Sequence, residues 1–389
     1  MEKLKKFNTK EEYQEWKDSD DYSYPNVCKV ADEIVYNDYP DYFWIEALED
    51  VTVKFHDGSG PIGEYSFDKK IWSAWESSGV TLRTGKRLYI RHTIQFYPRV
   101  VVSGRYNAGG SVLSLFYGSE YLKNTTHLTN RLIRLFAESK KIVSAKELVL
   151  ATVYQQEGSN QSGMYQELFK DCTLLKEPPK LPATLSPYCY VRMFSGCTSL
   201  TTAPSLLVSK DTGSPRGWYR EIYAGCSNLS YIKMLSPIQF DYSDTTSAWS
   251  RDWVSGVAAT GTFIANAKRT DFTRGVHGIP VGWDLYLYDE DNDRYVVKFK
   301  VNNIPYEFYT DEPRDVTWVE FCNSEHNTNG FTAQQEDGAT AKTIKFGDNY
   351  VLLSGNKVLI TDKVILNASY TIGQPTATTE LTETTNEEE

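Results

Sequence analysis

Three cysteines stand at equivalent places in the sequence and are the first residues to examine for chemistry. Cys172, Cys197 and Cys226 each follow Asp or Gly and precede Thr or Ser, and they are separated by 25 and then 29 residues. A thiolate can act as a nucleophile or as a zinc ligand. A nucleophile occurs once rather than in every repeat, and zinc sites need paired C-x-x-C or Cys/His clusters, which this sequence lacks. The spacing therefore predicts core packing of the thiols, with no catalytic residue, metal site or cofactor.

The cysteines belong to a repeat of the form Y-x-x-[LMI]-[FY]-x-[GD]-C-[ST]-x-L. Two incomplete copies flank the three full ones, with Ser139 or Val257 in place of Cys. The spacing of Tyr and Phe predicts a helical turn that ends at Gly or Asp and leads into a short extended segment. Such helix-turn-strand layers bury their apolar faces only when stacked. The predicted core residues of the stack are Phe136, Tyr165, Phe169, Cys172, Tyr190, Phe194, Cys197, Tyr219, Tyr223, Cys226 and Trp253.

Residues 129–283 resemble the BspA-type leucine-rich repeats, whose unit has the form MFxGCTSLTxAPxLPA. The runs MFSGCTSLTTAP (193–204) and LPAT (181–184) carry this likeness, and residues 256–263 and 278–283 resemble the end of such arrays. The resemblance implies a leucine-rich-repeat-like solenoid. It also implies a role in adhesion or in structure rather than in catalysis, so the chain is expected not to be an enzyme.

The sequence predicts an α+β protein that is mostly β, with five segments. They are an N-terminal attachment module (1–42), a β-sandwich-like domain (43–117), the repeat domain (118–283), a small β-rich domain (284–373) and a disordered acidic tail (374–389). Strand-like runs in the second segment are 42–47, 51–55, 62–67, 81–83, 87–92 and 99–103. Those in the fourth are 296–301, 304–308, 343–346, 350–353, 357–361 and 364–366.

Local signals predict further elements in the first and fourth segments. Thr9 and Glu12 form a capping box for a helix that ends near Ser19, and the runs 27–30 and 33–36 alternate as a β-hairpin does. A second short helix is expected near Thr317, with Trp318 and Phe321 on it.

Two motifs that suggest ligands are better explained as loops. GSGPIG at 58–63 satisfies G-x-G-x-x-G, but a strand pattern follows it where a dinucleotide site needs a helix. DEDND at 289–293 has acidic residues at positions 1, 3 and 5 of a calcium loop. An EF-hand is excluded because Arg294 stands where Gly is required and Lys300 where Glu is expected. A solvated acidic turn is the favoured interpretation, and a calcium site is the alternative.

Two segments of the chain resemble phage proteins. The opening KKFNTKEEYQEW, with YPNVCKV and DEIVYND after it, is similar to the N-terminal segment of structural proteins from Bacteroides phages, including crAss-like phages. TWVEFCNSEHNTNGF (317–331) resembles a C-terminal module of the same proteins. The resemblance implies a virion structural protein, a fibre or capsid-decorating component, made in the host cytoplasm. Segment 1–42 would attach it to other virion proteins, and the repeats would face a host-surface glycan or protein. By analogy we also expect a homo-oligomer.

Composition narrows the possible partners. The net charge of −10 argues against a nucleic acid partner. The sequence shows no signal peptide, no lipidation motif and no apolar run long enough to insert in a membrane, so the cysteines are expected as free thiols. A bacterial cell-surface adhesin is the alternative function, and it would need an export signal or anchor. A carbohydrate-processing enzyme ranks last because no spacing singles out a pair of carboxylates.

Four residues between the repeats are candidates for contact with a ligand. Trp218, Arg220, Trp249 and Arg251 do not fit the core pattern, and Trp beside Arg can stack on sugars or anchor a protein. The alternative is that Trp249 and Trp253 cap the stack. We place Trp253 in the core and expect Trp218 at the surface.

Overall fold

The computed structural model is mostly β, with several sheets and very little helix, which confirms the coarse fold prediction. It divides into two compact units, Met1–Phe263 with Arg269–Asp284 and Ile264–Lys268 with Leu285–Glu389. The described residues are 5–7, 27–30, 33–36, 41–56, 60–92, 98–121, 132–151, 163–182, 187–206, 217–236, 240, 248–270, 272–335, 342–344, 347, 349–352, 357–360, 365–366 and 368–371. The predicted helix between Thr9 and Ser19 and the acidic tail lie outside them.

The N-terminal segment contains the predicted hairpin. Strand β2 (Val27–Val30) pairs antiparallel with β3 (Glu33–Tyr36), and Val30 lies opposite Glu33. Strand β1 (Lys5–Phe7) adds to the other side of β2 in a parallel pairing.

Two sheets follow, and they contain the strands predicted between residues 42 and 103. One has the order β10-β5-β8 and the other β12-β11-β4-β9-β6-β7. Their strands are β4 (Phe43–Ala47), β5 (Val51–His56), β6 (Glu64–Ser66), β7 (Ser73–Ala74), β8 (Val80–Leu82), β9 (Arg87–Arg91), β10 (Arg99–Val102), β11 (Tyr106–Ser111) and β12 (Ile142–Val149). Helix α2 (Ser114–Tyr117) and the 3₁₀ turn η1 (Gly118–Glu120) lie between β11 and β12. The GSGPIG motif is followed by strand β6 rather than by a helix, as expected, and its first two residues lie outside the described ranges.

Strand β11 joins the second sheet to the repeats, and the sequence pattern did not predict it. The strand was missed because it contains Gly109 and Gly110, and glycine weakens a strand pattern. The structure supplies the reason for them: a Cβ on Gly109 would collide with the Trp44 ring, and one on Gly110 would collide with the Tyr42 carbonyl. β11 pairs antiparallel with β4 and parallel with β12, so the predicted segments 43–117 and 118–283 share one sheet.

The repeats do not contain the predicted helical turns, which is a correction to the sequence analysis. In the layer that begins at Tyr165, alternate N–H groups donate to the carbonyl three residues earlier, as Leu168 does to Tyr165. The N–H groups between them donate to the next layer instead, as Phe169 does to Met193. A helix would direct every N–H to its own fourth preceding residue. The chain therefore forms consecutive β-turns, with a positive φ at every fourth residue, including Glu167 and Asp171.

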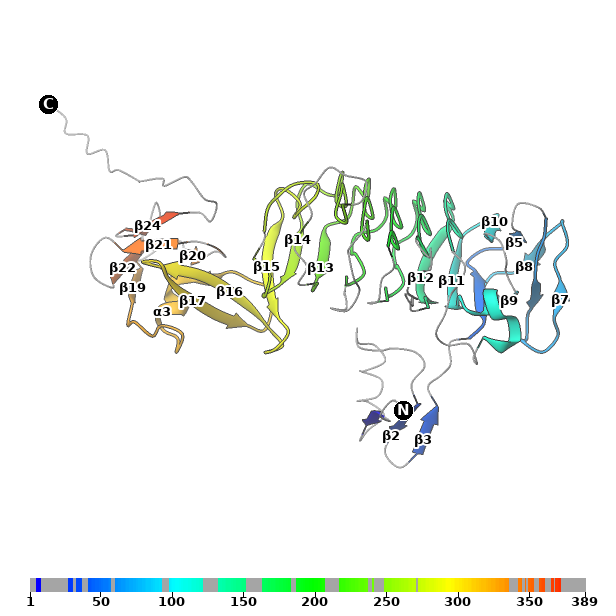
Figure 1. The fold of residues 1–389 in the computed structure, drawn as a ribbon, viewed down its shortest axis with the longest axis horizontal. Coiled ribbons are helices and arrows are strands. Elements are labelled where there is room, and N and C mark those ends of the chain that lie inside the picture. Colours follow the sequence, from blue (N-terminus) through cyan, green and yellow to red (C-terminus); the bar gives the residue numbers. More distant parts are fainter. Residues whose placement is uncertain are drawn as a thin grey trace. The chain divides into compact units, whose positions relative to one another are not determined.

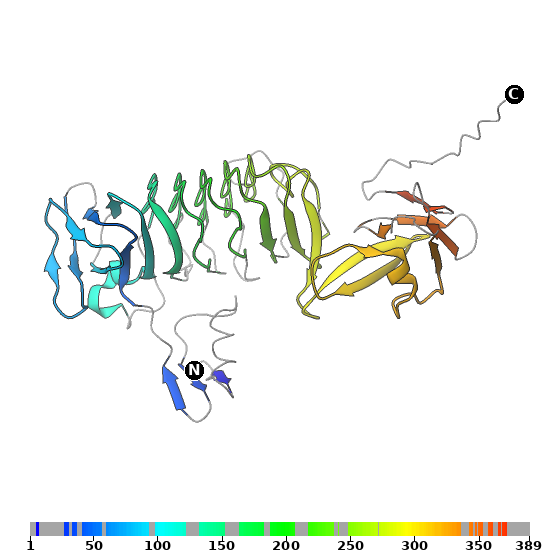
Figure 2. The same cartoon turned by 180° about the vertical axis from the view of Figure 1, so that it is seen from behind.

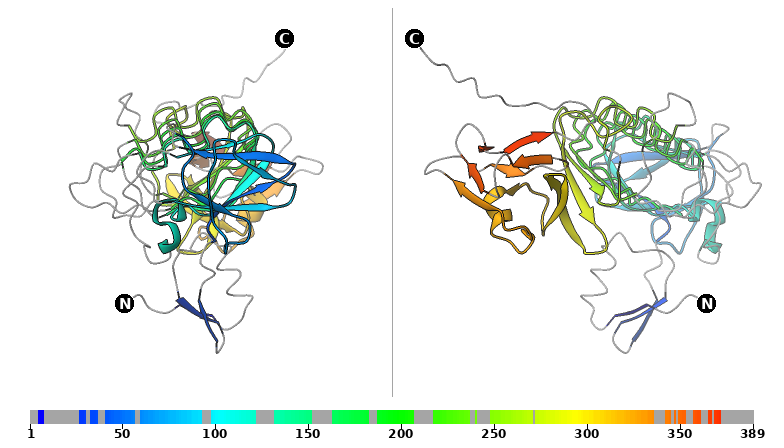
Figure 3. Two further views of the ribbon diagram at one scale, coloured as in Figure 1. Left: turned by 90° about the vertical axis from the view of Figure 1, so that its right-hand side faces the viewer. Right: turned by 60° about the vertical axis from the view of Figure 1, so that its left-hand side comes forward.

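Successive layers repeat this pattern and lie on one another. The backbone N–H of Tyr165 donates to the Cys189 carbonyl, and that of Tyr190 donates to the Trp218 carbonyl. Figure 1 and Figure 2 show the turns as a row of narrow parallel loops, coloured green, that follows β12. Seen along the row, the green turns overlie one another (Figure 3, left). Extended segments on the other side of each layer include β13 (Tyr231–Met234) and the start of β14 (Thr262–Asn266).

The predicted core residues form two columns of rings inside the stack. Phe169 stacks on Phe194 with ring centroids 5.6 Å apart and an interplanar angle of 2°. Tyr190 lies between Tyr165 and Tyr219 at 6.0 Å from each. All eleven residues proposed for the repeat core are buried.

The second unit has a core of its own, which includes Phe299, Trp318 and Phe321. Its hairpin is confirmed: β16 pairs with β17 around Asn302 and Asn303, which both have positive φ. The helix predicted near Thr317 is also confirmed, with a Thr317–Glu320 capping box. Its elements are β15 (Asp284–Asp289), β16 (Arg294–Val301), β17 (Ile304–Thr310), β18 (Val316–Thr317), α3 (Trp318–Cys322), β19 (Thr332–Gln335), β20 (Thr343–Ile344), β21 (Asn349–Leu352), β22 (Lys357–Ile360), β23 (Ile365–Leu366) and β24 (Ala368–Thr371).

Removing one ring from a column tests how much the stack depends on it. Phe194→Ala should lower the free energy of unfolding by about 3–5 kcal/mol, because it leaves a cavity between Phe169 and Tyr223. Chemical denaturation of the full chain measures this. Phe67→Ala is the control, since Phe67 is 55% exposed and its loss should cost less than about 0.5 kcal/mol. Equal losses in the two variants would contradict the column as a source of stability.

Candidate functional site

The repeated cysteines are hydrogen-bond donors inside the stack. The Sγ of Cys172, Cys197 and Cys226 lies 3.1, 3.1 and 3.0 Å from a Phe carbonyl oxygen of the preceding layer. Burial raises the pKa of Cys226 to about 12, and it raises the pKa of Cys172 and Cys197 above the ordinary thiol value as well. These thiols are therefore protonated at neutral pH, and a protonated buried thiol is a poor nucleophile and metal ligand. Among the described cysteines, Cys172, Cys197, Cys226 and Cys322 form no disulfide.

Two tyrosine hydroxyls of the stack donate to backbone carbonyls of the same unit. The Tyr165 hydroxyl donates to the Ala151 carbonyl at 2.6 Å, and the Tyr190 hydroxyl donates to the Pro182 carbonyl at 3.0 Å. Burial raises the pKa of both phenols well above the ordinary value. These two hydroxyls are therefore held in the neutral form, and each connects its ring to a backbone carbonyl.

The prediction that Trp218 lies at the surface is wrong. Trp218 is 1% exposed and Trp249 is 2% exposed. Their carbonyls accept hydrogen bonds from Tyr190 and Tyr219, as the carbonyl of the buried Cys189 does from Tyr165. The three side chains thus hold the same inward position in successive layers, and neither indole can be reached by a ligand. Cys189 and Trp218 stand one position before the repeat motif, which begins at Tyr190 and Tyr219. The motif therefore did not predict that they are buried.

The two arginines of the predicted set lie outside the core and are ion-paired. The Arg220 Nε is 3.7 Å from a Glu221 carboxylate oxygen, and the Arg251 Nε is 3.5 Å from Asp252. Since both tryptophans are buried, the four residues do not form the exposed aromatic and cationic cluster that the sequence analysis expected. Trp253, which was placed in the core, is fully buried.

A column of charged residues follows one side of the stack. Arg134, Glu167, Arg192 and Glu221 all have positive φ and occupy the same place in four layers. Opposite charges meet from layer to layer: Arg134 lies 3.2 Å from Glu167, and Arg192 lies 3.7 Å from Glu167 and 2.7 Å from Glu221. Left-handed backbone costs roughly 1 kcal/mol in a residue other than glycine, so these ion pairs offset a strain that the turns impose.

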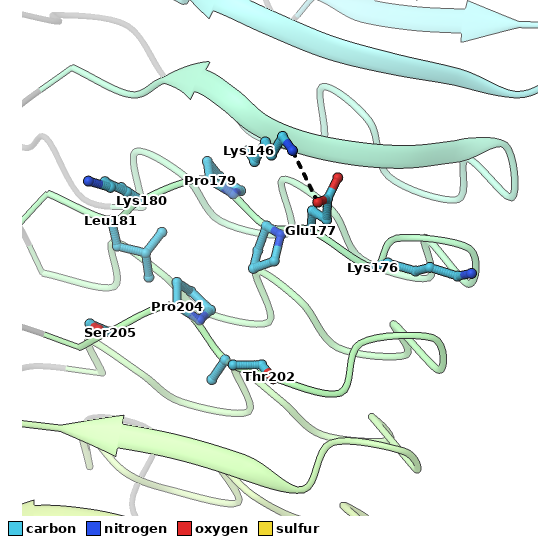
Figure 4. Close-up of a pocket in the computed structure, with 11 residues that line it drawn as sticks. Lys146, Lys176, Glu177, Pro179, Lys180, Leu181, Thr202, Pro204 and Ser205 are labelled. Atoms are coloured by element: carbon cyan, nitrogen blue, oxygen red, sulfur yellow. Dashed lines mark hydrogen bonds and ion pairs between the residues drawn. The ribbon is translucent and has the colours of Figure 1, made fainter. Parts of the chain in front are cut away.

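A shallow groove of about 430 Å³ is lined by β12 and by the extended segments that follow two of the turns, and the sequence analysis did not predict it (Figure 4). We call it the proline groove. Figure 4 shows Lys180 and Lys176 at opposite ends of the group, with Pro179, Pro204 and Leu181 between them. The Nζ of Lys146 lies 3.3 Å from a Glu177 carboxylate oxygen. The lining residues are Lys146, Lys176, Glu177, Pro178, Pro179, Lys180, Leu181, Thr202, Ala203, Pro204 and Ser205.

Proline explains why the groove lies here. Glu177 accepts a hydrogen bond from Ala145 and bridges Ser144 in a parallel ladder, but Pro178 and Pro179 follow at once. Proline has no N–H with which to continue such a ladder. Pro204 comes two residues after Thr202, which bridges Tyr231 in the next layer. Two signals in the sequence could have located this surface: proline recurs after the turns of two successive repeats, and lysines flank the first pair of prolines at 176 and 180.

The acidic turn at 289–293 has its oxygens engaged. Asp289 accepts from the Asp291 amide and the Asn292 side chain, and Asp291 pairs with Lys268 at 2.9 Å. The Asn266 amide donates to Glu290. Within the described ranges, no group of three His, Cys, Asp or Glu residues could hold a metal ion.

Comparison with known proteins gives no family for the chain. No protein-family model, curated protein or solved structure matches it significantly. Among the helices that the structure describes, none is long and apolar enough to cross a membrane.

The buried thiol of Cys226 should make the stack sensitive to alkali. The pKa of this thiol is 9.0 in the unfolded chain and about 12 in the folded chain. Below pH 9.0 the thiol is protonated in both the folded and the unfolded chain. Between pH 9.0 and about 12 it loses its proton only in the unfolded chain. The free energy of unfolding should therefore fall there by about 1.4 kcal/mol per pH unit for each such thiol. Cys226→Ala should reduce that slope by one proton, measured by urea unfolding with reductant across this range. An unchanged slope would contradict the raised pKa.

The charged column should contribute modestly to stability, in a way that depends on salt. Arg192→Gln removes contacts to Glu167 and Glu221, and because its side chain is 39% exposed the loss should be only about 1 kcal/mol. High salt should shrink this loss, as measured by denaturation in low and high salt. Arg83→Gln is the matched control: Arg83 is 83% exposed and 3.9 Å from Asp50, so no measurable loss is expected. A loss independent of salt would argue against ion pairing as the cause.

Proposed function

We propose that this chain is a non-enzymatic structural protein of a phage virion, a fibre or capsid-decorating component that assists assembly and adhesion to the host. In this proposal the stacked turns are a BspA-type leucine-rich-repeat-like solenoid. The two sheets before it are a sandwich-like domain, and residues 284–373 form a small β-rich domain. Segment 1–42 attaches the protein to other virion proteins, and the chain works as a homo-oligomer.

The observation that carries the proposal is that thiol and phenol groups of the repeat form hydrogen bonds to its own backbone. Cys197 and Cys226 donate to backbone carbonyls, and Tyr165 and Tyr190 do the same. A motif used in this way builds a rigid surface rather than a reaction centre. The repeats resemble an adhesion family, and the opening segment and residues 317–331 resemble phage structural proteins. Both resemblances favour display on a particle.

Purified phage particles test the proposal directly. Mass spectrometry of the particles should detect the chain, and immunogold labelling with an antibody to it should place gold on capsids or tails. The comparison sample is the envelope of uninfected host cells, which should carry no label. Particles that lack the chain, together with gold on the bacterial surface, would overturn the virion assignment and favour the cell-surface adhesin.

A further inference from the structure

We infer that the proline groove binds a polysaccharide chain that carries carboxylate groups. The inference rests on the proposed function in one respect, since an attachment protein meets the glycans of a cell surface. Three features of the site support it: its charge, its apolar lining and its hydrogen-bonding groups. It contains none of the four residues that the sequence analysis offered as ligand contacts.

The charge of the groove is opposite to that of the chain. Three lysines and one glutamate line it, whereas the whole protein has a net charge of −10. Glu177 offsets Lys146 through their contact at 3.3 Å. Lys176 takes part in no ion pair within the described part of the chain, and with Lys180 it lies at the rim. The positive excess attracts anions and repels cationic ligands.

The floor of the groove suits the C–H face of a sugar ring. Its apolar lining comes from Pro178, Pro179, Leu181, Ala203 and Pro204, and Thr202 and Ser205 add hydroxyl groups. The backbone around the prolines offers carbonyl acceptors, but no N–H from proline itself. A sugar supplies hydroxyl donors for such acceptors and apolar C–H groups for the floor. An open surface of this kind fits a chain lying across it better than a molecule enclosed on all sides.

The same features disfavour the two other anionic polymers. A peptide that adds as a strand needs alternating donors and acceptors from the protein edge, and the prolines remove the donors. Single-stranded nucleic acid relies on aromatic rings for base stacking, and the described residues that line the groove include no aromatic side chain. A uronic-acid polymer needs neither feature.

Calorimetric titration of the full chain with tetragalacturonate tests the inference. The probe pair is tetragalacturonate and its methyl ester, which keeps the sugar and removes the charge. We expect the acid to bind with a dissociation constant below about 10 mM and the ester to bind at least about tenfold more weakly. Added salt should weaken binding of the acid.

A double variant locates the site. Lys176→Gln with Lys180→Gln should weaken binding about tenfold, roughly threefold for each exposed lysine. Lys86→Gln with Lys300→Gln changes the net charge equally at exposed positions elsewhere, and should change affinity less than about twofold. Thermal unfolding of each variant checks that the fold is kept.

Four results would overturn the inference: no binding of the acid, equal binding of the ester, equal weakening in both double variants, or preferred binding of polyglutamate or a single-stranded oligonucleotide. The virion experiment fails or succeeds separately. If particles lack the chain, the calorimetric result still stands. If the protein does not bind tetragalacturonate, it could still be found on particles.

Discussion

The repeat region depends on one constraint: its backbone N–H groups donate hydrogen bonds alternately to their own layer and to the next layer. Every second N–H closes a β-turn within its own layer, and the N–H between joins the next layer, as Leu168 and Phe169 do. This division requires left-handed backbone at every fourth residue. Gly196 and Gly225 adopt it without a steric cost, whereas Glu167 and Arg192 adopt it while paired with charges of neighbouring layers.

The core of the stack and two of its surfaces follow from that constraint. Because each layer repeats the backbone of the last, rings stack on rings and each cysteine thiol faces a carbonyl of the layer before. On the charged side the same register brings Arg192 between two glutamates. On the side of the proline groove, proline interrupts the ladder and leaves an open surface with lysines at its rim. Packing, ion pairing and the proposed binding surface are thus consequences of one backbone pattern.

The sequence predicted which residues point inward better than it predicted how the backbone turns. The spacing of Tyr, Phe and Cys follows side-chain direction, and residues such as Phe169 and Cys197 are buried as expected. A spacing of four residues is shared by a helical turn and by paired β-turns, so it could not separate them. Positive φ at a charged residue leaves no mark in the sequence. Local signals that need no partner, such as the Thr317 capping box and the turn at Asn302, were predicted correctly. The burial of Trp218 and the strand β11 depend on neighbouring layers and strands, which no single segment reveals.

The register of the turns also determines which changes of chain length the region can tolerate during divergence. Equivalent residues are 25 apart between Thr173 and Thr198 but 29 apart between Arg192 and Glu221, and the layers still pair in the same way. Segments between turns can therefore lengthen by several residues without disturbing the stack. A single residue gained or lost inside a turn would exchange the two sets of N–H donors and move Phe194 or Cys197 out of the core. Insertions should accumulate between the turns, and the turns themselves should keep a constant length.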